Sequence, residues 1–194
     1  MSSFIMGSIE NLRHFVDSLG QGTFDFILLD PPWENKSVKR KKLYWTLKND
    51  HLFQLPIREL SAPGCLVAVW VTNRIKHINF IKEELFPFWN ISYVTTWYWL
   101  KVTKCGQTVC DIRSSHKKPY ELLLIGRHDK HTCFVSSDIN STENCMKQFL
   151  LKKTMISVPS SLHSSKVSLC DILQPILPKN PKCLELFARN LCPG

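Results

Sequence analysis

The tetrapeptide Asp30–Trp33 brings together residue types that could hold a flat amine. An acid, two prolines and an indole directly follow the apolar run Phe26–Leu29. The Asp30 carboxylate and the Pro31 carbonyl are hydrogen-bond acceptors, and the prolines fix two successive φ angles, so the carbonyls point in set directions. The indole of Trp33 is a plane suited to stacking on a base. The pattern predicts a grip for a planar amine; the alternative is a strand-ending turn followed by a packed tryptophan.

Such a grip would serve methyl transfer to the exocyclic amine of adenine. That amine is a poor nucleophile because its lone pair is delocalised into the ring. Two acceptors on its hydrogens, the Asp30 carboxylate and the Pro31 carbonyl, would favour a more tetrahedral nitrogen that attacks a sulfonium methyl in line. Pro32 would keep the loop rigid and Trp33 would stack on the base. Catalysis of this kind rests on positioning and electrostatics, without a covalent intermediate.

The elements around this motif predict an α/β fold with a mainly parallel sheet. Phe26–Leu29 is short, apolar and bounded by breakers, as buried strands are, and Asp30 then lies at its carboxyl end, where open α/β sheets bind ligands. Further strands are expected at Cys65–Val71, Ile91–Lys101, Glu121–Ile125, Met155–Val158 and Cys183–Phe187. Helices are expected at Ile9–Leu19, with Ser8 as N-cap and Gly20 as terminator, at Ile75–Leu85 and at Val167–Leu177. Strands that alternate with helices are typical of this class.

The charge of the chain favours a polyanionic partner. The 194 residues carry a formal net charge of +9, and 44% of them are hydrophobic. Basic residues gather directly after the motif, at Lys36, Lys39, Arg40, Lys41 and Lys42, and the aromatic Tyr44 and Trp45 follow. Interleaved basic and aromatic groups suit a nucleic-acid strand, while a nuclear import signal or a solvated loop remains an alternative. Without an apolar stretch of membrane-spanning length or a signal peptide, we expect an intracellular protein of the nucleus or cytosol.

The cysteines predict free thiols rather than a metal site. The chain has eight cysteines and no Cys-x-x-Cys pair, and Cys105 and Cys110 are the nearest neighbours. No histidine pair at zinc-finger spacing follows them, so a zinc-binding adaptor is the weakest of the alternatives. None of the seven histidines pairs with a serine or cysteine in a nucleophile pattern, and hydrolase chemistry has no support.

Several segments resemble the eukaryotic adenosine methyltransferase family that carries an Asp-Pro-Pro-Trp motif. They are Trp33–Arg40, Trp70–Arg74, Lys82–Leu85, His116–Glu121 and Glu185–Leu191, and they occur in order along nearly the whole chain. The resemblance implies a circularly permuted Rossmann-like fold of S-adenosylmethionine-dependent methyltransferases, with helices on both faces of the sheet. The catalytic strand then comes first and the cofactor strand, Leu184–Phe187, comes last. This order agrees with the absence of a Gly-x-Gly-x-x-Gly sequence after the first strand.

The resemblance also implies site residues and partners. S-adenosylmethionine would be bound by Asp30, by Lys166 at its carboxylate, and by Glu185, Arg189 and Asn190 near its ribose and methionine parts. Substrate would contact Asn35, Lys36, Lys39, Arg40, Lys118 and Tyr120, and Pro119 and Glu121 could line the same cleft. For the four residues 118–121 a structural role is the alternative. The implied acceptor is adenine in RNA, such as small nuclear RNA or mRNA, or in DNA, and no metal or membrane is involved.

Three departures from the family pattern leave a second function open. Ser165 and Val167 flank Lys166 where the family has His-Lys-Pro, and Ser8 stands where an acid is expected near the cofactor adenine. The sequence ends at Gly194, before the family's Trp, its Gly-Asn-Glu turn and the helix that follows. We therefore expect one methyltransferase domain, residues 1–194, that is incomplete at its C-terminus. A catalytically impaired form that binds nucleic acid or a protein partner is the alternative.

Overall fold

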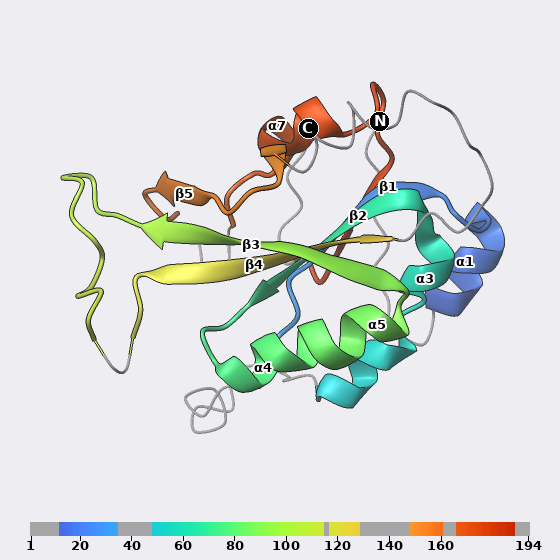
Figure 1. Cartoon of the computed structure of the whole chain (residues 1–194), viewed down its shortest axis with the longest axis horizontal. Helices are drawn as coiled ribbons and strands as arrows, with labels where there is room; N and C mark the ends of the chain where they lie inside the picture. The colour runs from blue at the N-terminus through green and yellow to red at the C-terminus, as the bar shows by residue number, and fades with distance from the viewer. Residues whose placement is uncertain (1–11, 35–47, 115–116, 129–147, 161–165, 189–194) are drawn as a thin grey trace.

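A computed structural model describes residues 12–34, 48–114, 117–128, 148–160 and 166–188, and it is built around one twisted sheet (Figure 1). The strands are β1 (Phe24–Leu29), β2 (Ser61–Val71), β3 (Ile91–Lys101), β4 (Tyr120–His128), β5 (Thr154–Ser157) and β6 (Cys183–Leu186). They lie side by side in the order β5-β3-β4-β2-β1-β6. All the predicted strands are present, with bounds that shift by a few residues.

The sheet is mainly parallel, as the sequence predicted. Within the described residues, β4 runs antiparallel to both of its neighbours, and the other pairings are parallel. The first strand, β1, lies between β2 and the last strand, β6. The chain thus leaves β1 toward one side of the sheet and returns to its other side at the end. Such a reversal of strand order opens a crevice at the carboxyl ends of the strands, and β1 leads directly into Asp30 there.

Helices cover both faces of the sheet, which confirms the predicted layers. One face carries α1 (Leu12–Leu19) and two short helices, η2 (Asn49–Gln54) and α3 (Ile57–Leu60). The same face carries a continuous helical segment formed by α4 (Ile75–Asn79), the π-helical η3 (Phe80–Leu85) and α5 (Phe86–Phe88). The other face carries α7 (Cys170–Leu173) and η4 (Gln174–Ile176), so α4–α5 and α7 lie on opposite sides in Figure 1. None of the described helices is long and apolar enough to cross a membrane.

Two of the predicted helices have different bounds in the structure. The helix expected over 167–177 is shorter, because Pro175 lacks an N–H and the α-helical turn gives way to η4. The helix expected from Ile9 is described from Leu12 onward as α1, and Ser8 lies outside the described residues.

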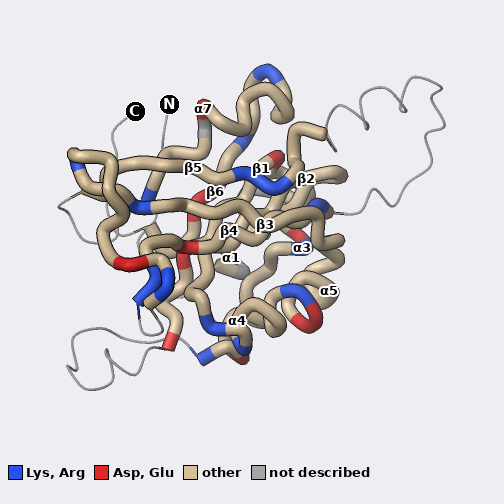
Figure 2. The backbone as a smooth tube through the Cα atoms, turned by 60° about the vertical axis from the view of Figure 1, so that its left-hand side comes forward, with Lys and Arg blue, Asp and Glu red and all other residues tan. Residues whose placement is uncertain are grey.

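Alternation along the strands divides the core into two layers. In β2, Val67 and Val69 pack under α4–α5, while Ala68 and Trp70 pack under α7. Both layers are almost wholly apolar: the buried polar residues of the described chain are Ser61, His77 and Thr95. In the described residues, Lys, Arg, Asp and Glu lie outside these layers, at strand ends, in loops and on the helices, for example around α4 and α5 (Figure 2). The charged residues that matter for chemistry lie at one edge of the sheet.

Gly126 in β4 is the position where the helical layer approaches the sheet most closely. A Cβ there would lie 2.4 Å from Ile91 Cγ2 and 2.9 Å from Phe86 Cε2. We expect Gly126→Ala to lower the free energy of unfolding by about 1–3 kcal/mol, because the overlap forces these side chains to move. Urea denaturation measures the effect. In the double variant Gly126→Ala/Ile91→Ala the loss should be smaller than the sum of the two single losses; strict additivity would contradict the packing.

Candidate active site

Asp30 is fixed at the carboxyl edge of the sheet by its own backbone. Its N–H donates to the carbonyl of Leu186 in β6 at 3.2 Å, so the start of the motif is tied to the end of the last strand. The Asp30 side chain is 15% exposed. The prediction that Asp30 directly follows a buried strand is thus confirmed, and its role toward a ligand stays a prediction.

An ammonium group lies between Asp30 and a second carboxylate. Lys166 Nζ is 3.4 Å from Asp30 Oδ1 and 2.6 Å from Glu121 Oε2. The other oxygen of Glu121, Oε1, pairs with Lys101 Nζ. Carboxylates and ammonium groups therefore alternate in a chain whose members come from the end of β1, the segment before α7, the start of β4 and the end of β3. One loop joins the end of β3 to the start of β4, whereas the end of β1 and the segment before α7 lie far from them in the sequence, and the fold brings all four together.

Glu121 is held ionised by its two lysines. Burial alone would raise the pKa of this carboxyl, but the charges and hydrogen bonds of Lys166 and Lys101 outweigh it and keep the pKa below its usual range. The sequence placed Glu121 in the cleft with a structural role as its alternative, and it gave no reason to place Lys101 there. The one available signal for Lys101 was its position at the end of a predicted strand, which many surface lysines share.

The two prolines form a tight turn that directs the Pro31 carbonyl. The N–H of Trp33 donates to Pro31 O at 2.8 Å, across Pro32. This is a three-residue turn of the kind found at strand ends. The carbonyl keeps a second lone pair, because a carbonyl oxygen has two. Its direction is set by the turn, as the sequence predicted.

Trp33 itself is placed differently from the prediction. The residue is 8% exposed, and its Nε1 donates to the carbonyl of Trp70 at 2.8 Å. Its ring packs against His77 with centroids 4.8 Å apart. The plane expected to stack on a base is therefore buried in the core and anchors the turn to the end of β2. The physical reason is that the indole finds both an apolar layer and a backbone acceptor there, which corresponds to the alternative of a packed tryptophan.

His77, beneath Trp33, is a neutral packing residue. Burial, together with the nearby positive charge of Arg74, lowers the pKa of its imidazole. The ring is therefore uncharged at neutral pH and can pack against the indole without an uncompensated charge. The turn that carries Asp30 is thus supported by two rings packed at an interplanar angle of 45°.

The end of β6 supplies a third carboxylate. Glu185 pairs with Leu28 across the sheet, and partial burial and the nearby charge of Asp30 raise the pKa of its carboxyl, although more than a third of the residue is exposed. Phe187 then adopts a φ of 66°, a left-handed conformation that is uncommon for a residue with a side chain. Conformations of this kind often occur at ligand sites. Arg189 and Asn190 lie outside the described residues.

The predicted substrate contacts are only partly described. Tyr120 is half-buried beside Glu121, and its carbonyl accepts the side-chain amide of Asn73 at 2.8 Å. Lys118 donates to the carbonyl of Ile112 at 3.1 Å within the loop between β3 and β4, and no described contact links it to Asp30. The remaining predicted contacts, Asn35, Lys36, Lys39 and Arg40, lie outside the described residues.

The arrangement provides binding groups for a polar ligand and a flat amine. Lys166 can bind a carboxylate, Glu185 can accept hydroxyl groups, and Asp30 with the Pro31 carbonyl can accept amine hydrogens. In the described part of the chain, no three His, Cys, Asp or Glu side chains are grouped to hold a metal ion.

Comparison with known proteins gives a consistent family assignment. The MT-A70 family model matches residues 24–194. The chain is 43% identical over 195 residues to N(6)-adenine-specific methyltransferase METTL4 of Homo sapiens, with 100% of the chain and 40% of that protein covered. It is 32% identical over 202 residues to N6-methyladenosine RNA methyltransferase MTA1 of Pyricularia oryzae and 34% identical over 199 residues to a DNA N6-methyl methyltransferase of Caenorhabditis elegans. These two matches cover all of the chain but only 50% and 49% of the relatives. The chain therefore spans two fifths to half of the length of the three relatives.

The Glu121 ion pairs predict a defined pH dependence of stability. Because its folded pKa is lowered, Glu121 contributes stability above its unfolded pKa of about 4.3, and this contribution is lost as the pH falls through the folded value. Near pH 7, Glu121→Gln should be less stable by about 1.5–3 kcal/mol. Denaturant titrations at decreasing pH should show the two proteins converge. The exposed Glu84→Gln serves as control and should match the wild type; a difference for Glu121→Gln that is independent of pH would contradict the ion pairs.

Proposed function

The chain belongs to the MT-A70 family, and we propose that it transfers a methyl group from S-adenosylmethionine to the exocyclic amine of adenine in a nucleic acid. The relatives named above act as N6-adenine methyltransferases, one of them on RNA and one on DNA. The observation that carries the proposal is the Asp30 carboxylate, fixed at the carboxyl edge of β1 beside Lys166 and next to a carbonyl of set direction.

The residues at this edge fit S-adenosylmethionine. An ammonium group has three protons; Lys166 donates one to Glu121 and forms an ion pair with Asp30, so it can also bind the carboxylate of the cofactor's methionine part. Glu185 is exposed for more than a third of its surface and can accept the ribose hydroxyls. When bound, the cofactor supplies a methyl group on a cationic sulfur, which becomes a neutral thioether once the methyl has gone to the amine.

Asp30 and Pro31 would prepare the amine of adenine. As a carboxylate, Asp30 offers only acceptors, so it accepts a hydrogen bond from one amine N–H and leaves the nitrogen lone pair for the methyl group. The remaining lone pair of the Pro31 carbonyl accepts a hydrogen bond from the second amine N–H. After transfer the nitrogen must lose a proton, and Asp30 is the nearest base. Because the groups are fixed before substrate arrives, little reorganisation is needed in the transition state.

The buried Trp33 would contribute through rigidity. Its bond to Trp70 and its contact with His77 hold the turn across Pro32, and with it the direction of the Pro31 carbonyl. An error of about 1 Å in such an acceptor can cost about a hundredfold in rate. We therefore assign Trp33 a positioning role, and the base-stacking role predicted from the sequence is not proposed.

The acceptor is proposed to be adenine in RNA, small nuclear RNA included, or in DNA. The net charge of +9 supports a polyanionic substrate. Because the relatives' names include both RNA and DNA, both nucleic acids are tested as substrates in the same assay. A place of action in the nucleus or cytosol belongs to the same proposal.

Asp30→Asn tests the chemistry. The substitution keeps the shape of the side chain and removes its charge, so we expect methylation of an adenine-containing oligonucleotide to fall by at least about a hundredfold. Transfer of a labelled methyl group to RNA and to DNA oligonucleotides is the measurement. Asp17→Asn, on the exposed side of α1, is the matched control and should keep wild-type activity. Wild-type activity in Asp30→Asn would refute the assignment, and no transfer by the wild type would favour the non-catalytic binding form.

Calorimetric titration with S-adenosylmethionine tests the cofactor half of the site. The wild type should bind one equivalent, and Lys166→Ala should bind about tenfold or more weakly because a charged hydrogen bond to the carboxylate is lost. Lys179→Ala, an exposed lysine before β6, controls for the change of charge. Equal affinity of Lys166→Ala and wild type would exclude the proposed contact. No binding by a folded wild-type chain would favour the non-catalytic form.

A further inference from the structure

We propose that an exposed face of the sheet binds a single strand of nucleic acid beside the target adenine; this inference rests on the proposed function and extends it. We call this surface the tyrosine face. Its members are Tyr93, Thr96, Tyr98 and Leu100 of β3, Tyr120 of β4, Thr154 and Ile156 of β5, and Val158, which directly follows β5.

Strand register puts these side chains on one side of the sheet. Leu100 lies opposite Tyr120 on β4 and opposite Ile156 on β5, and residues paired in this way point to the same face. A register shift between Tyr93 and Thr95 brings Tyr93 onto the same side. The Tyr93 hydroxyl accordingly lies 2.8 Å from the hydroxyl of Thr96.

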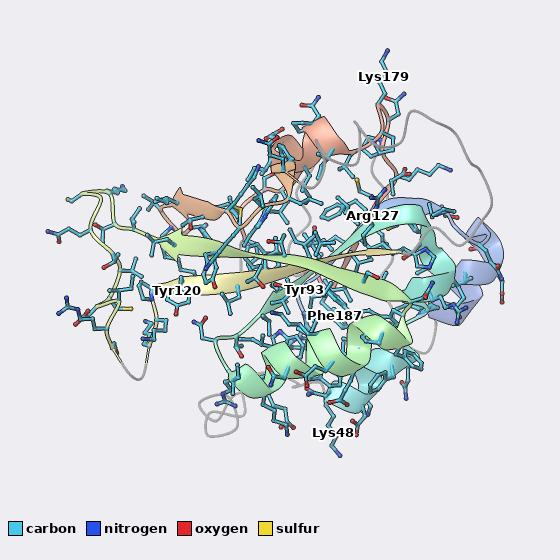
Figure 3. The ribbon with its side chains drawn as sticks, viewed as in Figure 1. Lys48, Tyr93, Tyr120, Arg127, Lys179 and Phe187 are labelled. Carbon is cyan, nitrogen blue, oxygen red and sulfur yellow. The ribbon has the colours of Figure 1, made fainter. Side chains whose placement is uncertain are left out.

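Helices leave much of this face uncovered. On β4 this face is covered: Phe86 of α5 packs closely at Gly126, and Leu122 and Leu124 belong to the same core layer. The exposed part lies on β3 and β5, where Tyr93 is 40% exposed, Ile156 63% and Val158, which follows β5, 50%. On the opposite side of the same strand, Trp97 and Trp99 are fully buried under α7. The aromatic residues of β3 thus alternate between a buried side and a partly exposed side, on which Tyr98 and Tyr120 are half-buried at the margin of the core; Figure 3 labels Tyr93 and Tyr120.

Lysines lie over the tyrosine rings. Lys82 Nζ is 4.1 Å from the centroid of Tyr93, and Lys152 Nζ is 4.8 Å from that of Tyr98. Each position therefore pairs an aromatic plane, which can stack on a base, with an ammonium group, which can bind the adjacent phosphate. An open hollow lined by Lys82, Asn90 and Tyr93, among others, adjoins this end of the face. The alternation of ammonium groups and aromatic planes favours a single-stranded nucleic acid, whose phosphates and bases alternate in the same way.

The face leads directly to the candidate active site. Tyr120 packs against Tyr98 with ring centroids 5.8 Å apart, and the next residue, Glu121, points to the other side and binds Lys166. From Tyr93 to Tyr98 the strand spans about 17 Å. A strand held along the tyrosines would therefore place its following nucleotide at the edge that carries Asp30.

The test is fluorescence anisotropy with 12-nucleotide single strands of RNA and of DNA, each with one central adenine. In Tyr93→Leu/Tyr98→Leu the apolar volume remains but the aromatic planes are lost. We expect the Kd to rise about tenfold or more, because base stacking on two rings is removed. Thermal unfolding by circular dichroism shows whether the variant remains folded.

A second pair of variants tests the charges without touching the core. Lys82→Glu/Lys152→Glu should weaken binding about tenfold and reduce the slope of log Kd against log salt by about 1.4, the value for two phosphate contacts on a single strand. Lys179→Glu/Lys182→Glu makes the same change of net charge in the exposed loop before β6, where Figure 3 labels Lys179, and should change the Kd less than about twofold.

These experiments distinguish a failure of the tyrosine face as a binding site from a failure of the proposed methyl transfer. Anisotropy needs no methyl transfer, so a loss of affinity in the face variants supports the tyrosine face even if the wild type methylates nothing. The proposed function fails separately, if Asp30→Asn methylates the oligonucleotide like the wild type while the face variants lose affinity. The tyrosine face is overturned if its variants bind both strands like the wild type, if the control pair weakens binding equally, or if the wild type binds neither strand. Unchanged binding would assign the face to a protein partner or to no ligand.

Discussion

The position of the Lys166 ammonium between Asp30 and Glu121 is the interaction on which the site depends. Three carboxylates meet at one edge of the sheet, and the charge of Asp30 already raises the pKa of the Glu185 carboxyl. Without a cation between them, such groups would repel one another or take up protons. Against the effect of burial, Lys166 and Lys101 lower the pKa of the Glu121 carboxyl, so this group remains an ionised acceptor beside Asp30. A partly buried arrangement of this kind is sensitive to the loss of any member, because the remaining charges are left uncompensated.

The motif and its surroundings divide the work between geometry and charge. Pro31 and Pro32 set a carbonyl direction, and Trp33, buried in the apolar layer and bonded to the end of β2, keeps the turn in place. The charged groups around Asp30 come from other parts of the chain: Lys101 from β3, Glu121 from β4 and Lys166 from the segment before α7. Methyl transfer needs no nucleophilic side chain, so a scaffold that orients acceptors around a flat amine provides what the chemistry requires.

β3 connects the site to the rest of the molecule. One side of the strand contributes tryptophans to the core and Lys101 to the site, and the other side presents tyrosines to solvent. Because successive side chains of a strand point to opposite faces, one strand can stabilise the fold and offer a binding surface without conflict. The exposed aromatic side adjoins the edge where adenine would be held, which relates substrate binding to catalysis through a single rigid element.

The sequence by itself determined the elements and the motif. Apolar runs bounded by breakers predicted the strands, and the fixed φ angles of Pro31 and Pro32 predicted a carbonyl of set direction after β1, because these are local properties of the chain. Tertiary structure decided the rest. The burial of Trp33, the contact of Lys101 with Glu121 and the open side of β3 all depend on which strands become neighbours, and that information is spread over residues far apart in the chain. Residue types at one position could not distinguish a stacking indole from an anchoring one; the acceptor on Trp70 and the apolar layer around it did.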